Sequence, residues 1–419
     1  MGHAALDRLQ LMPWDALEGL DAATPISRVL DGEAAERVID RTLRAQPTLT
    51  APQRTALVEA IFGVSLWRRR IAAQLELAPL ARTGVRSSGG PHEAALLLFG
   101  FLRDLAGLGD ARAAQLSGVK GPPPLPEPLN LADRFSFPDW IAQVLEEGRA
   151  PEEATQLAAS LCAPGPIFLR ANTLRTSRDA LAELLSAQGV LTEPCAMAGA
   201  GLRVTSQRPN LLALESFRAG LFEVQDEGSQ LLGELLEPQP GETLLDLCAG
   251  AGGKTLQLAA LLENRGRVIA SDPDQGRLAR LRKRAERAGA TCIEVGPPQS
   301  ADRVLVDAPC SELGTLRRGP DARWRKDPGQ AARSPALQRE ILETALAQVL
   351  PGGRLVYATC TLRQQENRAV ALAFEHDHRS LLRLPPRAGR SLPSSDGFFE
   401  SFPHRHGTDG FFAAIWQCN

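Results

Sequence analysis

Two cysteines follow segments that are predicted to be buried strands. Cys310 comes shortly after the apolar run 303–306, and Cys360 comes shortly after the run 354–358. A thiol can add covalently to an electron-poor ring and later leave again. A free cysteine is often only a packing residue. Two of them at strand ends, with Asp307 close to the first, indicate covalent catalysis.

A glycine-rich turn joins a predicted strand to a predicted helix over residues 246–255, with Asp246 at the end of the strand. A phosphate-binding loop needs a glycine where Cys248 stands, and a dinucleotide fingerprint needs one where Thr255 stands. An S-adenosyl-L-methionine site remains as the best match. Asp272 ends the next strand, where its carboxylate can accept hydrogen bonds from both ribose hydroxyls of the cofactor. The alternative role of Asp272 is that of a helix N-cap. The predicted cofactor-binding residues are Asp246, Cys248, Ala249, Gly250, Ala251, Gly252, Gly253, Lys254, Asp272 and Asp307.

The bulk composition describes a water-soluble chain. Its 419 residues suggest two or three domains, and its net charge of −2 gives no global attraction to nucleic acid. No apolar run reaches the length of a membrane helix, and the first residues lack the pattern of a signal peptide. The seven cysteines are widely spaced and form no Cys-x-x-Cys pair, which predicts free thiols and a cytoplasmic location. His404 and His406 lack partners at metal-ligand spacing, so no metal site is expected.

Basic residues gather in two segments. The first run, 277–287, is spread around a predicted helix and is best explained as a solvated face. The second run, 317–326, follows Cys310 in a loop interrupted by glycine and proline and contains Trp324. Cations interleaved with an aromatic ring are typical of single-stranded nucleic-acid contacts. We therefore consider this second run a candidate RNA-binding segment.

The pattern along the chain predicts three folded regions. Residues 1–117 repeat apolar positions at helical spacing and form an all-helical domain, and the proline-rich residues 118–128 form a stiff linker. Residues 129–240 form a small α+β module. From residue 241 to 419 strands alternate with helices, which predicts a parallel, doubly wound sheet with its ligand site at the carboxyl ends of the strands. The expected strands there are 243–248, 268–271, 292–295, 303–306 and 354–358, and the expected helices are 254–262, 275–287, 335–349 and 364–374.

The segments 246–255, 307–318 and 359–367 together resemble the RNA 5-cytosine methyltransferases of the RsmB/Sun and Nol/Nop family. Segments 170–175, 222–230 and 409–413 are similar to other parts of that family, so the resemblance covers about residues 130–419. The helical start resembles, less specifically, the NusB-like RNA-binding domain of the RsmB branch. The resemblance implies a Rossmann-like S-adenosyl-L-methionine-dependent catalytic domain, a monomer, and small-subunit ribosomal RNA as partner and substrate. The RNA-binding residues expected on this basis are Arg170, Arg317, Arg318 and Trp324.

The same resemblance implies roles for three residues. Cys360 is the thiol that attacks carbon 6 of cytosine, Asp307 is hydrogen-bonded to the base edge, and Cys310 helps to release the product. An ordinary thiol titrates at about pH 8.5, so we expect a positive group to lower the pKa of the attacking cysteine. Lys254 is one candidate, and a helix N-terminus near residue 364 is another.

The sequence departs from the family pattern at two places. Ala251 stands where the family usually has proline. Between Cys292 and Asp302 the family has an Asp-Ala pair against the adenine ring, and here the segment has no such aspartate. Either Glu294 substitutes for it, or the adenine rests on backbone and apolar contacts.

Three alternatives stay open at this point. The substrate could be transfer RNA. The enzyme could methylate DNA cytosine, with Cys310 as the nucleophile. The protein could also be a ribosome assembly factor that binds RNA without catalysis, which the missing aspartate alone would favour.

Overall fold

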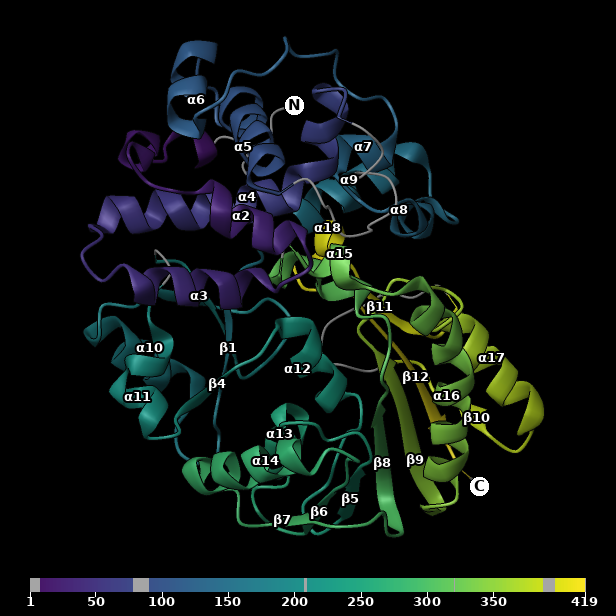
Figure 1. Ribbon diagram of the computed structural model, residues 1–419. Helices are drawn as coiled ribbons and strands as arrows, with labels where there is room; N and C mark the ends of the chain where they lie inside the picture. Colours follow the sequence, from purple (N-terminus) through teal and green to yellow (C-terminus); the bar gives the residue numbers. More distant parts are fainter. Residues whose placement is uncertain (1–7, 78–89, 207–208, 320, 387–395, 419) are drawn as a thin grey trace. The chain divides into compact units, whose positions relative to one another are not determined.

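The computed structural model describes residues 8–77, 90–206, 209–319, 321–386 and 396–418 (Figure 1). The chain divides into two compact units. The helical unit contains Met1–Pro164 together with Leu316–Pro328, and the catalytic unit contains Gly165–Thr315 together with Gly329–Asn419. Residues 129–164, which were predicted to belong to the α+β module, pack in the helical unit. Residues 1–7 and 78–89 of the predicted helical domain and Pro320 of the second basic run lie outside the described residues.

The helical unit is formed by amphipathic helices around a shared core. Its longest helix, α4 (Ala51–Gln74), begins at a capping box in which the Thr50 side chain accepts from the Gln53 backbone and the Gln53 side chain accepts from the Thr50 backbone. Residues 119–129 have no regular secondary structure. The other elements of this unit are η1 (Trp14–Leu17), α2 (Ala23–Leu30), α3 (Ala35–Ala45), α5 (Gly90–Gly100), η3 (Phe101–Leu105), α6 (Asp110–Ser117), α7 (Leu131–Phe135), α8 (Asp139–Glu146), α9 (Pro151–Cys162) and α15 (Ala322–Arg325).

The segment Leu316–Pro328 packs in the helical unit, although it is more than 150 residues away in the sequence from the rest of that unit. Its Arg323 is completely buried and donates to the carbonyl oxygens of Phe135, Ser136 and Leu161. The guanidinium also lies 4.0 Å from the centre of the Phe137 ring. These bonds satisfy both terminal nitrogens of a charged group that would otherwise be costly to bury, while its Nε atom has no hydrogen-bond partner among the described residues.

The small α+β module is an antiparallel sheet in the order β2-β3-β1-β4. One face packs on α10 (Arg178–Ala187), which Ser177 caps by accepting from the Ala180 backbone. Leu169, Leu202 and Phe222 are among the buried residues of this core. The four strands are β1 (Phe168–Ala171), β2 (Thr192–Pro194), β3 (Gly201–Val204) and β4 (Phe222–Val224), and the short helices are η4 (Leu211–Ala213) and α11 (Glu215–Arg218).

The main sheet of the catalytic unit has the order β10-β12-β9-β8-β5-β6-β7, with β11 paired to β12 (Figure 1). From β7 to β9 neighbouring strands are parallel, as predicted, but β12 is antiparallel to β9, so the sheet is mixed. The direction of the chain changes at β5, which lies between β6 and β8, and such a switch point opens a crevice at the strand ends. The strands are β5 (Thr243–Asp246), β6 (Arg267–Ala270), β7 (Ile293–Val295), β8 (Ala301–Asp307), β9 (Val349–Thr359), β10 (Leu382–Arg383), β11 (Phe399–Ser401) and β12 (Phe411–Gln417).

Both faces of this sheet are buried. Leu244 and its neighbours on one face join a core with α12 (Glu227–Glu234), α13 (Gly253–Leu261) and α14 (Gln275–Ala288), whereas Leu245 joins a core with α16 (Pro328–Leu346) and α17 (Arg368–Asp377) on the other. Successive residues of a strand point to opposite faces, so the continuous apolar runs of the sequence supply both cores. The remaining elements are η5 (Leu313–Arg318) and α18 (Pro403–His406). Among the described residues, no helix is long and apolar enough to cross a membrane.

Candidate active site

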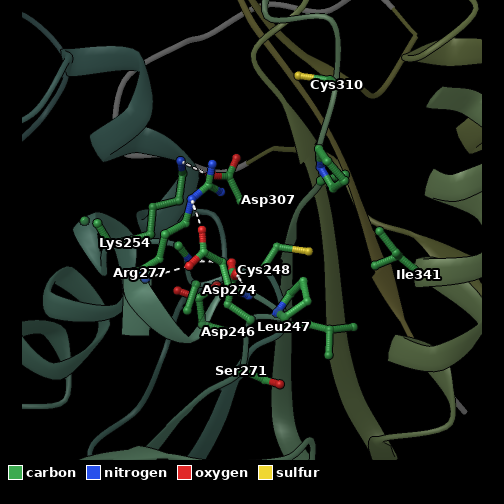
Figure 2. A pocket seen from close by; sticks show the side chains of 18 of the residues that line it. Asp246, Leu247, Cys248, Lys254, Ser271, Asp274, Arg277, Asp307, Cys310 and Ile341 are labelled. Carbon is green, nitrogen blue, oxygen red and sulfur yellow. Dashed lines mark hydrogen bonds and ion pairs between the residues drawn. The ribbon is translucent and has the colours of Figure 1, made fainter. Parts of the chain in front are cut away.

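A cavity of about 840 Å³ lies at the carboxyl ends of β5, β6, β8 and β9, within the catalytic unit. Figure 2 shows the acidic and basic side chains on one part of its wall and Cys310 at the end of β8. The cavity is lined by every predicted cofactor-binding residue except Gly252, and by both Cys310 and Cys360. The predicted cofactor-binding residues, except Gly252, and both predicted thiols therefore lie around one cavity.

The turn between β5 and α13 takes a shape that suits glycine. Gly250 and Gly252 have φ angles of 53° and 87°, which side chains rarely adopt. A Cβ atom on Gly252 would lie 2.6 Å from the Leu281 side chain, whereas one on Gly250 would meet no atom within 4 Å. Gly252 is therefore needed for packing below the turn, and Gly250 leaves the backbone open to a ligand.

Asp272 holds this turn. Its Oδ2 atom accepts a 2.8 Å hydrogen bond from the Gly250 backbone, and its Oδ1 atom accepts from the Asp274 backbone. The N-cap of α14 is Asp274, whose side chain accepts from the Arg277 backbone. The alternative role of Asp272 as a helix cap thus belongs to Asp274, and Asp272 remains at the cavity wall.

Asp246 is a buried carboxylate that has one oxygen unsatisfied. Its Oδ2 atom accepts a 2.7 Å bond from the Thr255 hydroxyl, while its Oδ1 atom is buried without a hydrogen bond among the described residues. Burial raises its pKa to about 7. An unsatisfied buried acceptor on a cavity wall fits a ligand that brings a donor or a positive charge.

Lys254 and Asp307 form an ion pair across the cavity wall, from the start of α13 to the end of β8. Lys254 Nζ lies 2.6 Å from Asp307 Oδ2, and Figure 2 shows the two side chains pointing toward each other. Burial opposes the charge of Lys254, but the carboxylate and its hydrogen bond raise the pKa of the lysine above its usual value. The lysine therefore keeps its proton at neutral pH.

The two thiols predicted to work together lie side by side. Cys310 Sγ is 3.5 Å from Cys360 Sγ, and both residues are partly buried. The hydrogen bond with Cys310, followed by burial and the charges of Asp307 and Glu312, raises the pKa of Cys360 well above its ordinary value. The expectation of a lowered thiol pKa is wrong for the free protein. Lys254 is engaged by Asp307, and α17 begins at Arg368 rather than near residue 364.

Part of the cavity wall was not predicted from the sequence. Leu337, Ile341 and Thr344 of α16 line the cavity opposite the glycine turn. Their spacing of three and four residues marks one face of a helix and could have signalled a shared surface. Gln225 and Ser229, from the end of β4 and the start of α12, also line it. These residues add polar and apolar contacts beyond the predicted motif.

Glu294 does not take the place of the missing aspartate. Both of its carboxylate oxygens accept from the Arg267 side chain, and the residue is exposed on β7 outside the cavity lining. Its pKa is lowered by that same ion pair. Of the two explanations, backbone and apolar contacts to the adenine remain.

Two of the predicted RNA contacts are buried and already bonded. Trp324 donates from Nε1 to the Ser65 carbonyl at 2.7 Å, and the Arg68 guanidinium covers its ring at 4.0 Å. Arg170 is 4% exposed and donates to the Gln225 side chain and the Gly253 carbonyl. Neither side chain can face a nucleotide, so both predictions are wrong. Arg317 is half-buried and Arg318 is exposed in η5, and both stay candidates.

Comparison with known proteins decides between the open classes. Residues 233–417 match the family model of 16S rRNA methyltransferase RsmB/F, and residues 137–210 match its ferredoxin-like domain. The probable ribosomal RNA small subunit methyltransferase B of Synechocystis is 35% identical over 69% of this chain and 68% of its own length. The chain belongs to the RsmB/F methyltransferase family. It is an RNA (cytosine-5)-methyltransferase that depends on S-adenosyl-L-methionine, as the other members of the family are, so the assembly-factor alternative is not favoured.

Other RsmB/F relatives and solved structures agree with this assignment. Ribosomal RNA small subunit methyltransferase B of Vibrio cholerae is 36% identical over 68% of this chain and 66% of its own length. The crystal structure of PH0851 covers 97% of this chain and 99% of its own, with 25% identity and a TM-score of 0.76. A methyltransferase homologue from Pyrococcus horikoshii has 27% identity and a TM-score of 0.57, covering 67% of this chain and 99% of its own. The match of PH0851 extends over nearly all of the RsmB/F chain described above.

Proposed function

We propose that this methyltransferase forms 5-methylcytosine in small-subunit ribosomal RNA through a covalent bond between Cys360 and carbon 6 of the base. The observation that carries the proposal is the 3.5 Å separation of the Cys310 and Cys360 sulfur atoms at the rim of the cofactor cavity. Carbon 5 of cytosine is a poor nucleophile until a group adds at carbon 6. One thiol can make this bond while its neighbour serves the step that breaks it.

In the first step Cys360 loses its proton to solvent water, and the thiolate sulfur adds to carbon 6. The electron pair of the ring double bond becomes available at carbon 5, and negative charge develops at the N3 edge of the base. The Lys254–Asp307 pair presents a donor and an acceptor to that edge, which stabilises the charge and orients the ring. S-adenosyl-L-methionine, when bound, supplies an electrophilic methyl group for carbon 5.

Release requires one proton transfer and one elimination. Cys310 acts as the thiolate and takes the proton from carbon 5, so that its S–H bond forms as the C–H bond breaks. The electron pair of that C–H bond restores the ring double bond and expels the sulfur of Cys360. This order assigns bond formation to Cys360 and proton removal to Cys310.

The cofactor is held by the glycine turn and the two carboxylates around it. Asp246 offers its unsatisfied oxygen, Asp272 fixes the turn at Gly250, and the open face at Gly250 admits a ligand to the backbone. The free N–H groups at the start of α13 add a positive helix end. This donor and acceptor set fits S-adenosyl-L-methionine.

The covalent step can be tested with RNA that contains 5-fluorocytosine. Fluorine cannot leave carbon 5 as a proton does, so the adduct should persist after methyl transfer. We expect wild-type protein, cofactor and a small-subunit ribosomal RNA transcript to form a species stable to denaturation, with the nucleotide on Cys360 by peptide mapping. A nucleotide attached to Cys310 would overturn the assignment and would favour the mechanism considered above for DNA.

The substrate is tested separately with transcripts of small-subunit ribosomal RNA and of transfer RNA, each unmodified. The names of the bacterial relatives support ribosomal RNA for this chain as well. We expect 5-methylcytosine in the ribosomal transcript and none in transfer RNA. Methylation of transfer RNA alone would contradict the proposed substrate and would leave the covalent mechanism intact.

A further inference from the structure

The backbone on both sides of Cys310 is held by two buried side chains from other elements. Glu366 Oε2 accepts a 2.8 Å bond from the Ser311 backbone, and Gln338 Nε2 donates 3.0 Å to the Pro309 carbonyl. Gln338 Nε2 also donates to Glu366 Oε2 at 3.2 Å, so the two side chains form one unit. Both are 0% exposed. Main-chain groups directly before and after the thiol are thus fixed in one clamp.

The chain around Cys360 is held by Asn367, the residue that follows Glu366 in the sequence. Asn367 Oδ1 accepts a 2.5 Å bond from the Thr359 hydroxyl, and its Nδ2 atom donates 3.0 Å to the Thr361 carbonyl. Asn367 is 3% exposed and Thr359 is 0% exposed. The clamp on Cys360 also has one bond on each side of the thiol, but only the bond to the Thr361 carbonyl goes to the backbone, and the other goes to the Thr359 side chain.

The two clamps are joined in three places. The Ser311 and Thr361 hydroxyls lie 2.6 Å apart, and the Gly314 backbone donates 3.0 Å to the Cys360 carbonyl. Glu366 and Asn367 are also consecutive in the chain, so the two clamps share one stretch of backbone. A buried carboxylate such as that of Glu366 is costly unless paired, and Arg363 Nη1 compensates it at 3.0 Å from Oε1.

We propose that Glu366 and Asn367 are positioning residues that set the geometry of the two thiols, with Glu366 acting through Cys310 and Asn367 acting through Cys360. Neither side chain lines the cofactor cavity, so neither is proposed to touch the cofactor or the base. The assignment of a separate kinetic step to each clamp rests on the thiol roles in the proposed function. The clamp geometry itself does not depend on those roles.

The variants are chosen to open each clamp from both of its sides. Glu366→Leu and Gln338→Leu remove the polar contacts next to Cys310, and Glu366→Gln keeps one acceptor as the conservative replacement. Asn367→Ala and Thr359→Val open the clamp next to Cys360. Glu375→Gln is the matched control, because Glu375 is a partly buried carboxylate on α17 that pairs with Arg383 and Trp416 away from the thiols. Thermal unfolding shows which variants fold.

The first measurement is independent of catalysis. Phenylarsine oxide bonds two thiols at once and releases one water molecule, so its affinity depends on how well the two sulfur atoms are held together. We expect the variants of either clamp to bind it about tenfold more weakly than wild type, and Glu375→Gln to bind it normally. Cys310→Ser provides the baseline for single-thiol binding. Wild-type affinity in folded Gln338→Leu and Thr359→Val proteins would overturn the proposal.

The second measurement separates the two steps on a small-subunit ribosomal RNA transcript. Opening the Cys310 clamp should leave adduct formation within about twofold of wild type and slow release tenfold or more, so that the covalent species accumulates. Glu366→Gln should fall between wild type and Glu366→Leu. Opening the Cys360 clamp should slow formation of the adduct tenfold or more, and the covalent species should not accumulate. Equal slowing of both steps by both sets of variants would contradict the division.

The outcomes distinguish this inference from the proposed function. If Cys310→Ser fails to accumulate an adduct but the clamp variants still bind phenylarsine oxide more weakly than wild type, the clamps position the thiols and the proposed thiol roles are wrong. If Cys310→Ser accumulates an adduct but the clamp variants behave as wild type in both measurements, the thiol roles stand and the inference is wrong.

Discussion

Lys254 Nζ lies 2.6 Å from Asp307 Oδ2, which joins the glycine turn to the end of β8, three residues before Cys310. The lysine side chain is 11% exposed and the aspartate 30%. This contact ties the cofactor-binding part of the site to the base-binding part. It also explains why Lys254 does not lower the pKa of Cys360 in the free protein, because its charge is compensated by the carboxylate.

Removal of the positive partner should impair chemistry more than folding. We expect Lys254→Met to slow adduct formation about a hundredfold, because the charge that develops on the base loses its donor. Asp307→Asn should have a similar effect, and the double variant should be only slightly slower than either one, since the two residues act as a pair. Single-turnover assays with saturating cofactor measure these rates. Additive losses in the double variant would show that the two residues act separately.

The pKa of Cys360 predicts how the free thiol reacts. A raised pKa means that the thiolate fraction at a given pH is smaller, so alkylation of Cys360 by iodoacetamide should still be accelerating above pH 9.0, the ordinary value. The hydrogen bond with Cys310 is the largest cause of the shift, so Cys310→Ala should move the midpoint to lower pH. Mass spectrometry of the Cys360 peptide measures the rate. A plateau below pH 9.0 in wild type would contradict this prediction.

Asp246 should reduce the stability of the free protein at neutral pH while serving the cofactor. Its pKa is raised from 3.8 to about 7, so its contribution to stability is full below pH 3.8 and is lost as the pH rises through about 7. Asp246→Asn should therefore be more stable than wild type near pH 8, by about 1 kcal/mol or more, and the difference should vanish near pH 4. Urea denaturation at both values tests this.

The same variant should bind S-adenosyl-L-methionine more weakly, because the unsatisfied oxygen is replaced. Calorimetry measures this second effect. A variant that is less stable than wild type near pH 8 would indicate that Asp246 is stabilised by contacts beyond the Thr255 hydroxyl.

Much of the catalytic unit could be predicted because its signals are local. The glycine turn depends on residues within ten positions of each other, and alternating apolar runs gave five strands of the sheet. The start of α16 was placed too late, at Pro335, because proline usually begins a helix. In the structure Pro335 lies inside a helix that starts at Pro328.

What sequence could not reveal depends on distant partners. Trp324 among arginines has the composition of an RNA-binding loop, yet its partner Ser65 is 259 residues away in the sequence. Arg170 is likewise satisfied by Gly253, 83 residues away. Such contacts convert an apparently exposed cation or ring into part of a core. The clamps of Glu366 and Asn367 were missed for a related reason, because several of their bonds go to backbone groups, which no side-chain pattern marks.

Arg323 should be essential for the stability of the helical unit. Truncation to Met leaves the carbonyl oxygens of Phe135, Ser136 and Leu161 buried without this donor, so we expect a loss of about 2–4 kcal/mol. Arg37→Met is the matched control, since Arg37 is an exposed arginine on α3 of the same unit. Arg37→Met should lower the free energy of unfolding by less than about 0.5 kcal/mol. Urea denaturation compares the two, and equal stability of both variants would contradict the role of Arg323.

The division of labour between Cys310 and Cys360 is the central claim, and single-cysteine variants test it most directly. Each variant is incubated with S-adenosyl-L-methionine and an unmodified small-subunit ribosomal RNA transcript, and the products are separated on a denaturing gel. We predict that Cys310→Ser accumulates a protein–RNA adduct that carries the nucleotide on Cys360, while Cys360→Ser forms neither adduct nor 5-methylcytosine. An adduct in Cys360→Ser, together with none in Cys310→Ser, would contradict the account.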